Sequence, residues 1–237
     1  TVISTVADVV DTAHIELLED FPEAEIIGYH GQTLTHAPER GVTVQAGRGA
    51  ALANALERPV VWDFRTADVK LGGQGAPLAP FYHFALARRL GFKAPVAFVN
   101  IGGVANLTWI DATAQTPEQP GACLAFDTGP GNALIDDYCQ RHLDRRMDKD
   151  GALTRSGAVR EDVLDGFLEA HPYFPKMPPK SLDRNDFSTW AEAVEGLPDA
   201  QAIATLAAGT AASIVKGLDH CPDLPKRLLI TGGGRHN

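Results

Sequence analysis

The spacing of apolar positions divides the chain into helices, strands and glycine-rich connections. Apolar side chains recur at i, i+3, i+4 and i+7 over residues 5–20 and 201–218, which predicts two amphipathic helices. Shorter helices are predicted over "GAALANALE", "FYHFALARRL" and residues 131–143, and Gly91 is expected to end the second of these.

Strands are predicted where apolar residues alternate or run together. "AEIIGYH" and "GVTVQAG" are separated by the polar stretch "HGQTLTHAPERG", which we expect to break the strands, and "PVVWDF" indicates a buried strand. From residue 94 the strands follow back to back: "PVAFVNIGG" and "VANLTWID" indicate a hairpin, and "ACLAFDTG" and "RLLITGGG" indicate two more strands. The proline-rich residues 171–180 are expected to lack regular structure. Together these elements predict an α/β fold with a mixed sheet and a domain boundary near residues 91–95.

Composition narrows the class of protein. The 237 residues suffice for one large domain or two small ones, and a hydrophobic content of 44% supports a packed core. The net charge of −9 argues against nucleic acid as the main partner, and no run of 18 apolar residues predicts a membrane span. Three cysteines without a CxxC pair, and no visible secretory signal, favour a reducing, cytoplasmic location.

Five polar segments that carry glycine follow the predicted strands: "HGQTLTH", "DFRTADVKLGGQGAP", "NIGGVAN", "DTGPGN" and "TGGGRHN". Ligands of α/β folds bind beyond strand ends, and glycine lets the backbone approach a phosphate closely. The alternative is plain turn chemistry, for which glycine is equally suited. None of the segments has the standard phosphate-loop or dinucleotide spacing. Their number favours a ligand site.

Asp127 stands out because it follows the apolar "LAF" and precedes "TGPG". It is either a helix N-cap or turn carboxylate, or a functional group that holds a magnesium ion through water or accepts a proton from a nucleophile. Its position beside a stiff glycine–proline turn favours the functional role. Asp136 and Asp137 are expected to face solvent on the following helix.

Other polar residues leave their roles open. Three histidines lie in or near these segments: His30, His36 and His83. Their spacing does not favour a metal site, and hydrogen bonding is the expected role. Asp63, Arg65 and Asp68 either form an ion pair that braces the turn or form a clamp in which Arg65 binds a carboxylate or hydroxyl group.

Several of these segments, taken together, resemble anhydro-N-acetylmuramic acid kinases: "YHGQTLTHAP", "VVWDFRTADVKLGGQGAPLAP", "VNIGGVANLTWI", "FDTGPGNALID", "DKDGALTRSGAV", "PPKSLDRNDF" and "TGGGRHN". The resemblance covers nearly the whole chain. It implies membership of the sugar kinase, actin and heat-shock protein superfamily, in which two ribonuclease-H-like domains with mixed sheets flank an interdomain cleft. It also implies conversion of 1,6-anhydro-N-acetylmuramate, ATP and water into N-acetylmuramate 6-phosphate and ADP, a step of peptidoglycan recycling in the bacterial cytoplasm.

The resemblance assigns roles to individual positions. It makes Asp127 the catalytic base and implies ATP and Mg²⁺ as cofactors, with no metal site built from protein ligands alone. The expected nucleotide-binding residues are Gly102, Gly103, Asn106, Gly129, Gly131, Asn132, Gly232, Gly233, Gly234 and Asn237. The expected sugar-binding residues are His30, Gln32, Thr33, Asp63, Arg65, Gln74 and Gly75.

Two segments of the family pattern have no counterpart here: the amino-terminal glycine- and serine-rich phosphate loop, and the region after "GGGRHN". The resemblance therefore implies that residues 1–93 are part of a first, sugar-binding domain, and that residues 94–237 are most of a second, nucleotide-binding domain. The family also implies a homodimer. The alternatives are a catalytically incomplete fragment that binds sugar or forms an interface, and a different sugar kinase of the same superfamily.

Overall fold

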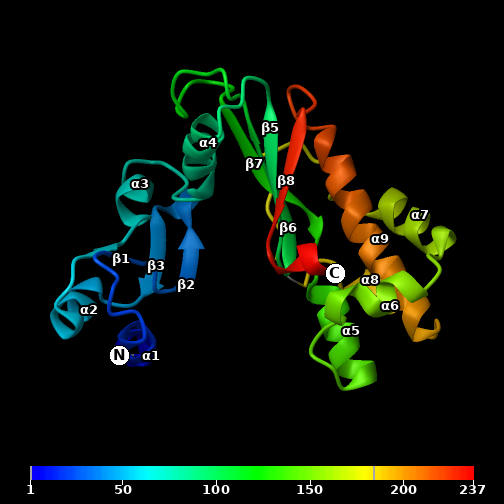
Figure 1. Cartoon of the computed structure of the whole chain (residues 1–237), viewed down its shortest axis with the longest axis horizontal. Helices are drawn as coiled ribbons and strands as arrows, with labels where there is room; N and C mark the ends of the chain where they lie inside the picture. The colour runs from blue at the N-terminus through cyan, green and yellow to red at the C-terminus, as the bar shows by residue number, and fades with distance from the viewer. Residues whose placement is uncertain (1, 184) are drawn as a thin grey trace. The chain divides into compact units, whose positions relative to one another are not determined.

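The computed structural model describes residues 2–183 and 185–237, which form two compact units that divide between Leu78 and Ala79 (Figure 1). Thr1, and Arg184 within the motif "PPKSLDRNDF", lie outside this description. The sequence places the boundary near residues 91–95. The difference is helix α4 (Ala79–Arg89), which packs on the sheet of the second unit.

The first unit is built from short strands and the helices beside them. Its elements are α1 (Val2–Glu19), β1 (Ile27–Tyr29), β2 (Gln32–Ala37), β3 (Val42–Ala46), α2 (Gly49–Leu56), β4 (Val60–Trp62) and α3 (Thr66–Lys70). Strands β1 and β4 pair in parallel, and β2 and β3 form an antiparallel hairpin around the 3₁₀ turn Pro38–Arg40. Its hydrophobic core consists of Ile27, Tyr29 and Leu52 with flanking residues of α1 and α2.

Two predictions for this unit are wrong. The stretch expected to break the strands contains β2, whose residues Gln32–His36 are all exposed. Main-chain hydrogen bonds to β3 hold this strand, and none of these side chains needs to be buried. The strand therefore shows no hydrophobic pattern in the sequence. The second error concerns β4, which was expected to be buried. Val61 and Trp62 are 48% and 44% exposed, because β4 has only β1 as a neighbour and forms a two-stranded sheet.

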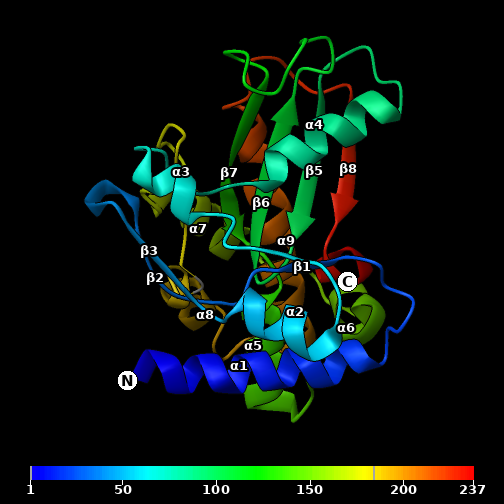
Figure 2. The ribbon, with the colours of Figure 1, turned by 90° about the vertical axis from the view of Figure 1, so that its left-hand side faces the viewer.

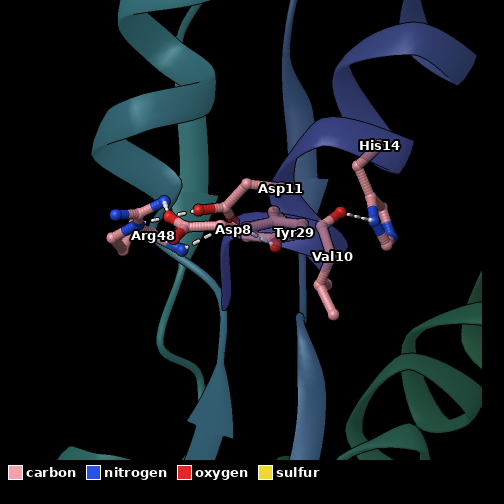
Figure 3. A network of polar contacts seen from close by, with 6 residues as sticks. All are labelled: Asp8, Val10, Asp11, His14, Tyr29 and Arg48. Carbon is pink, nitrogen blue, oxygen red and sulfur yellow. Dashed lines mark hydrogen bonds and ion pairs between the residues drawn. The ribbon is translucent and has the colours of Figure 1, made fainter. Parts of the chain in front are cut away.

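A buried carboxylate anchors α1 (Figure 3). Asp11 is 3% exposed and accepts hydrogen bonds from the Tyr29 hydroxyl at 2.7 Å and from the backbone N–H and Nε of Arg48 at 2.9 and 2.8 Å. Burial alone would raise the pKa of Asp11, but the hydrogen bonds from Tyr29 and Arg48 outweigh burial and lower it. This network ties α1 to β1 and to the start of α2.

The second unit is organised around a four-stranded sheet in the order β7-β6-β5-β8. Its strands are β5 (Val96–Ile101), β6 (Val104–Ile110), β7 (Cys123–Pro130) and β8 (Arg227–Thr231). Strands β5 and β6 form the predicted hairpin, β6 and β7 are antiparallel, and β5 and β8 are parallel. The mixed sheet predicted from the sequence is therefore confirmed.

Different helices cover the two faces of this sheet (Figure 2). Helix α9 (Asp199–Leu218) packs through Ile214 and Leu218 on one face, against Val99, Leu107 and their neighbours. On the other face, α4 packs through Phe84 and Ala87 against Val96, Phe98 and Ile110. Side chains that alternate between the two faces of β5 and β6 therefore meet a helix on either side, and most of them are buried, whereas the edge strand β8 stays largely exposed.

A helical layer completes the unit beyond α9. It contains α5 (Ala133–Leu143), α6 (Ala152–Ser156), α7 (Glu161–Ala170) and α8 (Ser188–Ala193). The aromatic residues Phe167, Phe174, Phe187 and Trp190 form its core. The predicted lack of regular structure over residues 171–180 is confirmed. Over the part of the chain that the structure describes, no helix is both long and apolar enough to cross a membrane.

Candidate active site

A line of polar residues crosses the sheet of the second unit near one end. Asp127 of β7 pairs with Asn106 of β6, which in turn pairs with Asn100 of β5. Asn100 also pairs with Thr231 of β8. Because directly paired residues project to the same face of a sheet, we treat these four residues as one feature, the polar row.

The polar row lies on the face that α4 covers. Asn100 follows Phe98 by two residues, and Phe98 packs beneath α4, where the ring of His83 stacks on it with centroids 4.4 Å apart. The polar row is therefore the next row along the strands. Asn100, Asn106 and Asp127 are half-buried and Thr231 is exposed, so polar groups are accessible at this end of the face.

Three of the five glycine-bearing segments meet at the same end of the sheet. The Asn132 N–H donates to the Gly102 carbonyl at 2.7 Å, and the Gly131 N–H donates to the Gly103 carbonyl at 3.0 Å. A Cβ at Gly232 would overlap the Ile101 carbonyl. "NIGGVAN", "DTGPGN" and "TGGGRHN", which are far apart in the sequence, therefore form one group of turns beside the polar row.

Asp127 occupies a position that differs from the one expected. Strand β7 continues through Pro130, so Asp127 lies within a strand and not at a turn, and the N-cap residue of α5 is Asn132. The strand continues because Gly129 and Pro130 still pair with Ala105 and Val104 of β6, past a register shift that accommodates Thr128. The N-cap alternative for Asp127 is thereby excluded.

The surroundings of Asp127 disfavour its charged form. Its Oδ2 accepts a hydrogen bond from the Leu182 N–H at 2.8 Å. Burial raises the pKa of Asp127, and this hydrogen bond opposes the rise without cancelling it. A carboxylate whose pKa is raised by burial, in an accessible polar row, has the properties of a general base.

The glycines of the three turns fall into two groups. Gly129 and Gly131 are buried, and an added Cβ would overlap Ser213 of α9 and the Gly102 carbonyl, respectively. Packing inside the protein therefore explains these two glycines, as it explains Gly232 and Gly234, whose Cβ positions would overlap Ile101. By contrast, an added Cβ at Gly102 or Gly103 would meet neighbours only at 3.5 Å, and at Gly233 it would meet none within 4 Å.

Asn237 lies at the edge of the same group of turns. Its Oδ1 lies 2.8 Å from Thr154 Oγ1, and the Thr154 N–H donates to the buried carboxylate of Asp148 at 2.9 Å. Its Nδ2 is buried and has no hydrogen-bond partner among the described residues. The amide therefore retains a donor that the rest of the described chain does not use.

In the first unit, three of the predicted sugar-binding residues lie together. Arg65 Nε donates to His30 Nε2 at 2.9 Å, and Arg65 Nη1 donates to the Gly75 carbonyl at 2.7 Å. The Gly75 N–H donates to Asp68 Oδ2 at 2.6 Å. Arg65 and Asp68 thus hold the "GGQG" loop, and this bracing uses hydrogen bonds to the loop backbone instead of the ion pair considered above.

The other predicted sugar-binding residues are spread around this group. Gln32 and Thr33 lie on β2, where Thr33 Oγ1 accepts from Gln45 Nε2 at 3.4 Å. Asp63 follows β4 with a left-handed backbone (φ 56°), which non-glycine residues seldom adopt, and Gln74 is exposed on the loop. Among the described residues, no hydrogen bond or ion pair joins these four side chains to Arg65.

Two kinds of residue could not be recognised from the sequence patterns. Asn100 and Thr231 enter the polar row only through strand register. Tyr173, Lys180 and Leu182 contact Asp127 from a segment more than forty residues away in sequence. Within residues 2–183 and 185–237, no three His, Cys, Asp or Glu side chains are grouped to hold a metal ion.

Taken together, the second unit is a mixed α/β domain whose glycine turns and polar row meet at one sheet end, an arrangement typical of ligand-binding enzymes of the α/β class. A family model described as anhydro-N-acetylmuramic acid kinase matches residues 3–237. The chain belongs to this family.

Curated relatives agree with the family match. The chain is 54% identical over 229 residues to the anhydro-N-acetylmuramic acid kinase of Roseobacter denitrificans, covering 97% of this chain and 60% of the relative. It is 57% identical over 235 residues to the protein of the same name from Cereibacter sphaeroides, covering 99% and 63%. The Ruegeria relative of that name is 52% identical, covering 99% and 62%. The chain thus spans about 60% of the length of these relatives.

Proposed function

We propose that the protein carrying this chain is an ATP-dependent kinase that hydrolyses the 1,6-anhydro bond of 1,6-anhydro-N-acetylmuramate and phosphorylates O6. The products are N-acetylmuramate 6-phosphate and ADP. The observation that carries the proposal is the position of Asp127, half-buried with a raised pKa, in a polar row beside three glycine turns. The family match and the names of the relatives support the same reaction.

The second unit supplies the nucleotide side of the proposed site. Gly102, Gly103 and Gly233 have room around them that no described residue fills, so a phosphate can approach their backbone closely. Asn106, with its neighbours Asn100 and Thr231 in the polar row, adds side-chain donors. Gly129, Gly131, Gly232 and Gly234 contribute by letting the turns pack closely, whereas Asn132 and Asn237 offer amide groups beside the nucleotide.

The first unit supplies the sugar side. Arg65 is the proposed partner of the lactyl carboxylate, because its guanidinium has five N–H donors and its hydrogen bonds to His30 and Gly75 use two of them. His30, Gln32, Thr33, Asp63, Gln74 and Gly75 lie on or next to the strand and loops that carry this arginine. We propose that they contact the hydroxyl and acetamido groups of the sugar.

The chemistry requires a base that faces water. The anhydro sugar has no free 6-hydroxyl, so there is no proton for a kinase base to remove at O6. In the proposed step Asp127 takes a proton from a water molecule while the water oxygen bonds to C1, the C1–O6 bond breaks, and O6 accepts the γ-phosphoryl group as ADP leaves. This combines the geometry of an inverting glycosidase with phosphoryl transfer.

Several finer points belong to the same proposal. Mg²⁺ would be held mainly by phosphate oxygens, since a single carboxylate, Asp127, lies in the polar row, and a magnesium site of this kind needs few protein ligands. We also propose two ribonuclease-H-like domains with a cleft, a cytoplasmic location and a homodimer, as the resemblance implies.

The central test is Asp127→Asn in the full-length protein. General-base catalysis typically contributes about 10²–10⁴-fold, so kcat should fall by about that factor while the Kd for the anhydro sugar is unchanged. Asp165→Asn, which alters an exposed aspartate of α7, is the matched control and should retain full activity. A kcat of Asp127→Asn close to that of the unaltered protein would remove Asp127 from this role.

Substrate panels and calorimetry separate the alternatives. ATP hydrolysis stimulated by glucose or N-acetylmuramate, but not by the anhydro sugar, would identify a different sugar kinase. Calorimetry with ATP on the 237-residue chain tests the incomplete-fragment alternative, because micromolar binding requires a substantially complete nucleotide site. Sugar binding without ATP binding would favour the fragment.

A further inference from the structure

The irregular segment of residues 171–182 makes three hydrogen bonds to one residue of the sheet. The Tyr173 hydroxyl donates to the Asp127 carbonyl at 2.6 Å, and the Asp127 N–H donates to the Lys180 carbonyl at 3.3 Å. The Leu182 N–H donates to the Asp127 carboxylate at 2.8 Å. Since β7 is an edge strand, its outward N–H and C=O groups need partners, and this segment supplies both at Asp127.

The segment is itself held in place by a half-buried ammonium group. Lys180 Nζ donates to the Phe174 carbonyl at 3.1 Å and lies 3.0 Å from His220 Nε2. It also lies 4.7 Å above the Tyr173 ring. Burial lowers the pKa of Lys180. One lysine therefore closes the loop between Phe174 and Lys180 and supports the tyrosine that contacts Asp127.

Tyr173 does not reach the accessible part of the site. It is 4% exposed, and its ring packs in the aromatic core beside Phe174 and Phe187. Its hydroxyl bonds to the backbone of Asp127 and not to the carboxylate. Any effect of Tyr173 on a reaction at Asp127 must therefore pass through the position of Asp127.

We infer that Tyr173 and Lys180 are positioning residues, which hold residues 171–182 against β7 so that the Asp127 carboxylate has one orientation. This inference rests on the proposed function, in which Asp127 is the base. If the carboxylate is displaced from the water it must deprotonate, the two groups are no longer aligned for proton transfer. A misplacement of about 1 Å costs about 10²-fold in rate.

The test is Tyr173→Phe in the full-length protein, which removes the hydroxyl and keeps the ring. We expect kcat to fall by about 10- to 100-fold, with the KM values for ATP and the anhydro sugar unchanged. Lys180→Met should lower kcat in the same way, and it provides a second variant should Tyr173→Phe not fold. The matched control is Tyr138→Phe, since Tyr138 is also buried in this unit and its hydroxyl bonds to Asp199.

A double variant distinguishes positioning from general stability. If Tyr173 acts through Asp127, adding Tyr173→Phe to Asp127→Asn should lower the residual kcat no further, whereas independent effects would multiply. If Asp127→Asn keeps full kcat, the proposed function fails. If Asp127→Asn loses activity but Tyr173→Phe and Lys180→Met keep it, or if Tyr138→Phe loses as much, only the positioning inference is overturned.

Discussion

Two aspartates, the buried Asp11 and the half-buried Asp127, show how differently surroundings act on the same side chain. Asp11 has a lowered pKa because a tyrosine hydroxyl and an arginine compensate its burial. Asp127 has a raised pKa because its burial is opposed by only one hydrogen bond to the carboxylate, from the Leu182 N–H. A compensated carboxylate stabilises the fold, whereas an undercompensated one costs stability and is a candidate for chemistry.

This difference predicts that Asp127→Asn stabilises the fold. Because the folded pKa of Asp127 lies above its ordinary value of 3.8, ionisation opposes folding. The free-energy cost of this ionisation is fully present at pH values above the folded pKa and absent at pH values below the ordinary pKa. Denaturation should therefore show a higher free energy of unfolding for the variant at neutral pH, with a gain that shrinks as the pH falls toward about 4. A variant less stable than the parent at neutral pH would contradict the prediction.

At the scale of elements, the three glycine turns combine a structural and a binding role. Gly131 must be glycine because the Gly102 carbonyl occupies the space of a Cβ, and this contact brings the start of α5 against the hairpin turn. Gly102, on the other side of the same contact, has no such neighbour. Within this one pair of turns, packing requires glycine at position 131, whereas position 102 leaves space for a ligand.

Alanine should therefore affect stability at Gly131 and ligand binding at Gly102. Gly131→Ala is expected to destabilise the second unit by about 1–3 kcal/mol, as overpacking does. Gly102→Ala should leave the denaturation midpoint unchanged and, under the proposed function, weaken ATP binding in calorimetry. Equal loss of stability in both variants would show that the hairpin turn, too, is packed on all sides.

At the scale of the whole molecule, the two compact units have separate hydrophobic cores. The first core is small and centres on Ile27, Tyr29 and Leu52. The second comprises both faces of the four-stranded sheet and the aromatic layer around Phe167 and Trp190. Small cores bury a smaller fraction of their surface and are correspondingly less stable.

Denaturation of the 237-residue chain should accordingly show two transitions. Trp62 reports on the first unit, and Trp109 and Trp190 report on the second. We expect the Trp62 signal to change at the lower denaturant concentration, and Trp62→Phe to remove that early change in fluorescence. A single transition with coincident signals from all three tryptophans would show that the units unfold cooperatively.

Most elements could be predicted because their own side chains encode them. Three signals lie within the segments that they predict: the apolar periodicity of α9, the two glycines of the β5–β6 hairpin, and the prolines of residues 171–180. Strand β2 could not be predicted, since its exposed side chains carry no pattern and its backbone pairs with β3. The exposure of β4 depends on its having a single neighbour, which no local pattern records.

For the candidate site, the sequence by itself determined the family, the aspartate and the glycine turns, because these depend on residue type and order. Only the tertiary structure decided what surrounds them. Strand register joined Asn100 and Thr231 to Asp127, and a distant segment placed Tyr173 and Leu182 on the same residue. Register and long-range packing arise from the free energy of the whole fold, so no stretch of sequence contains them alone.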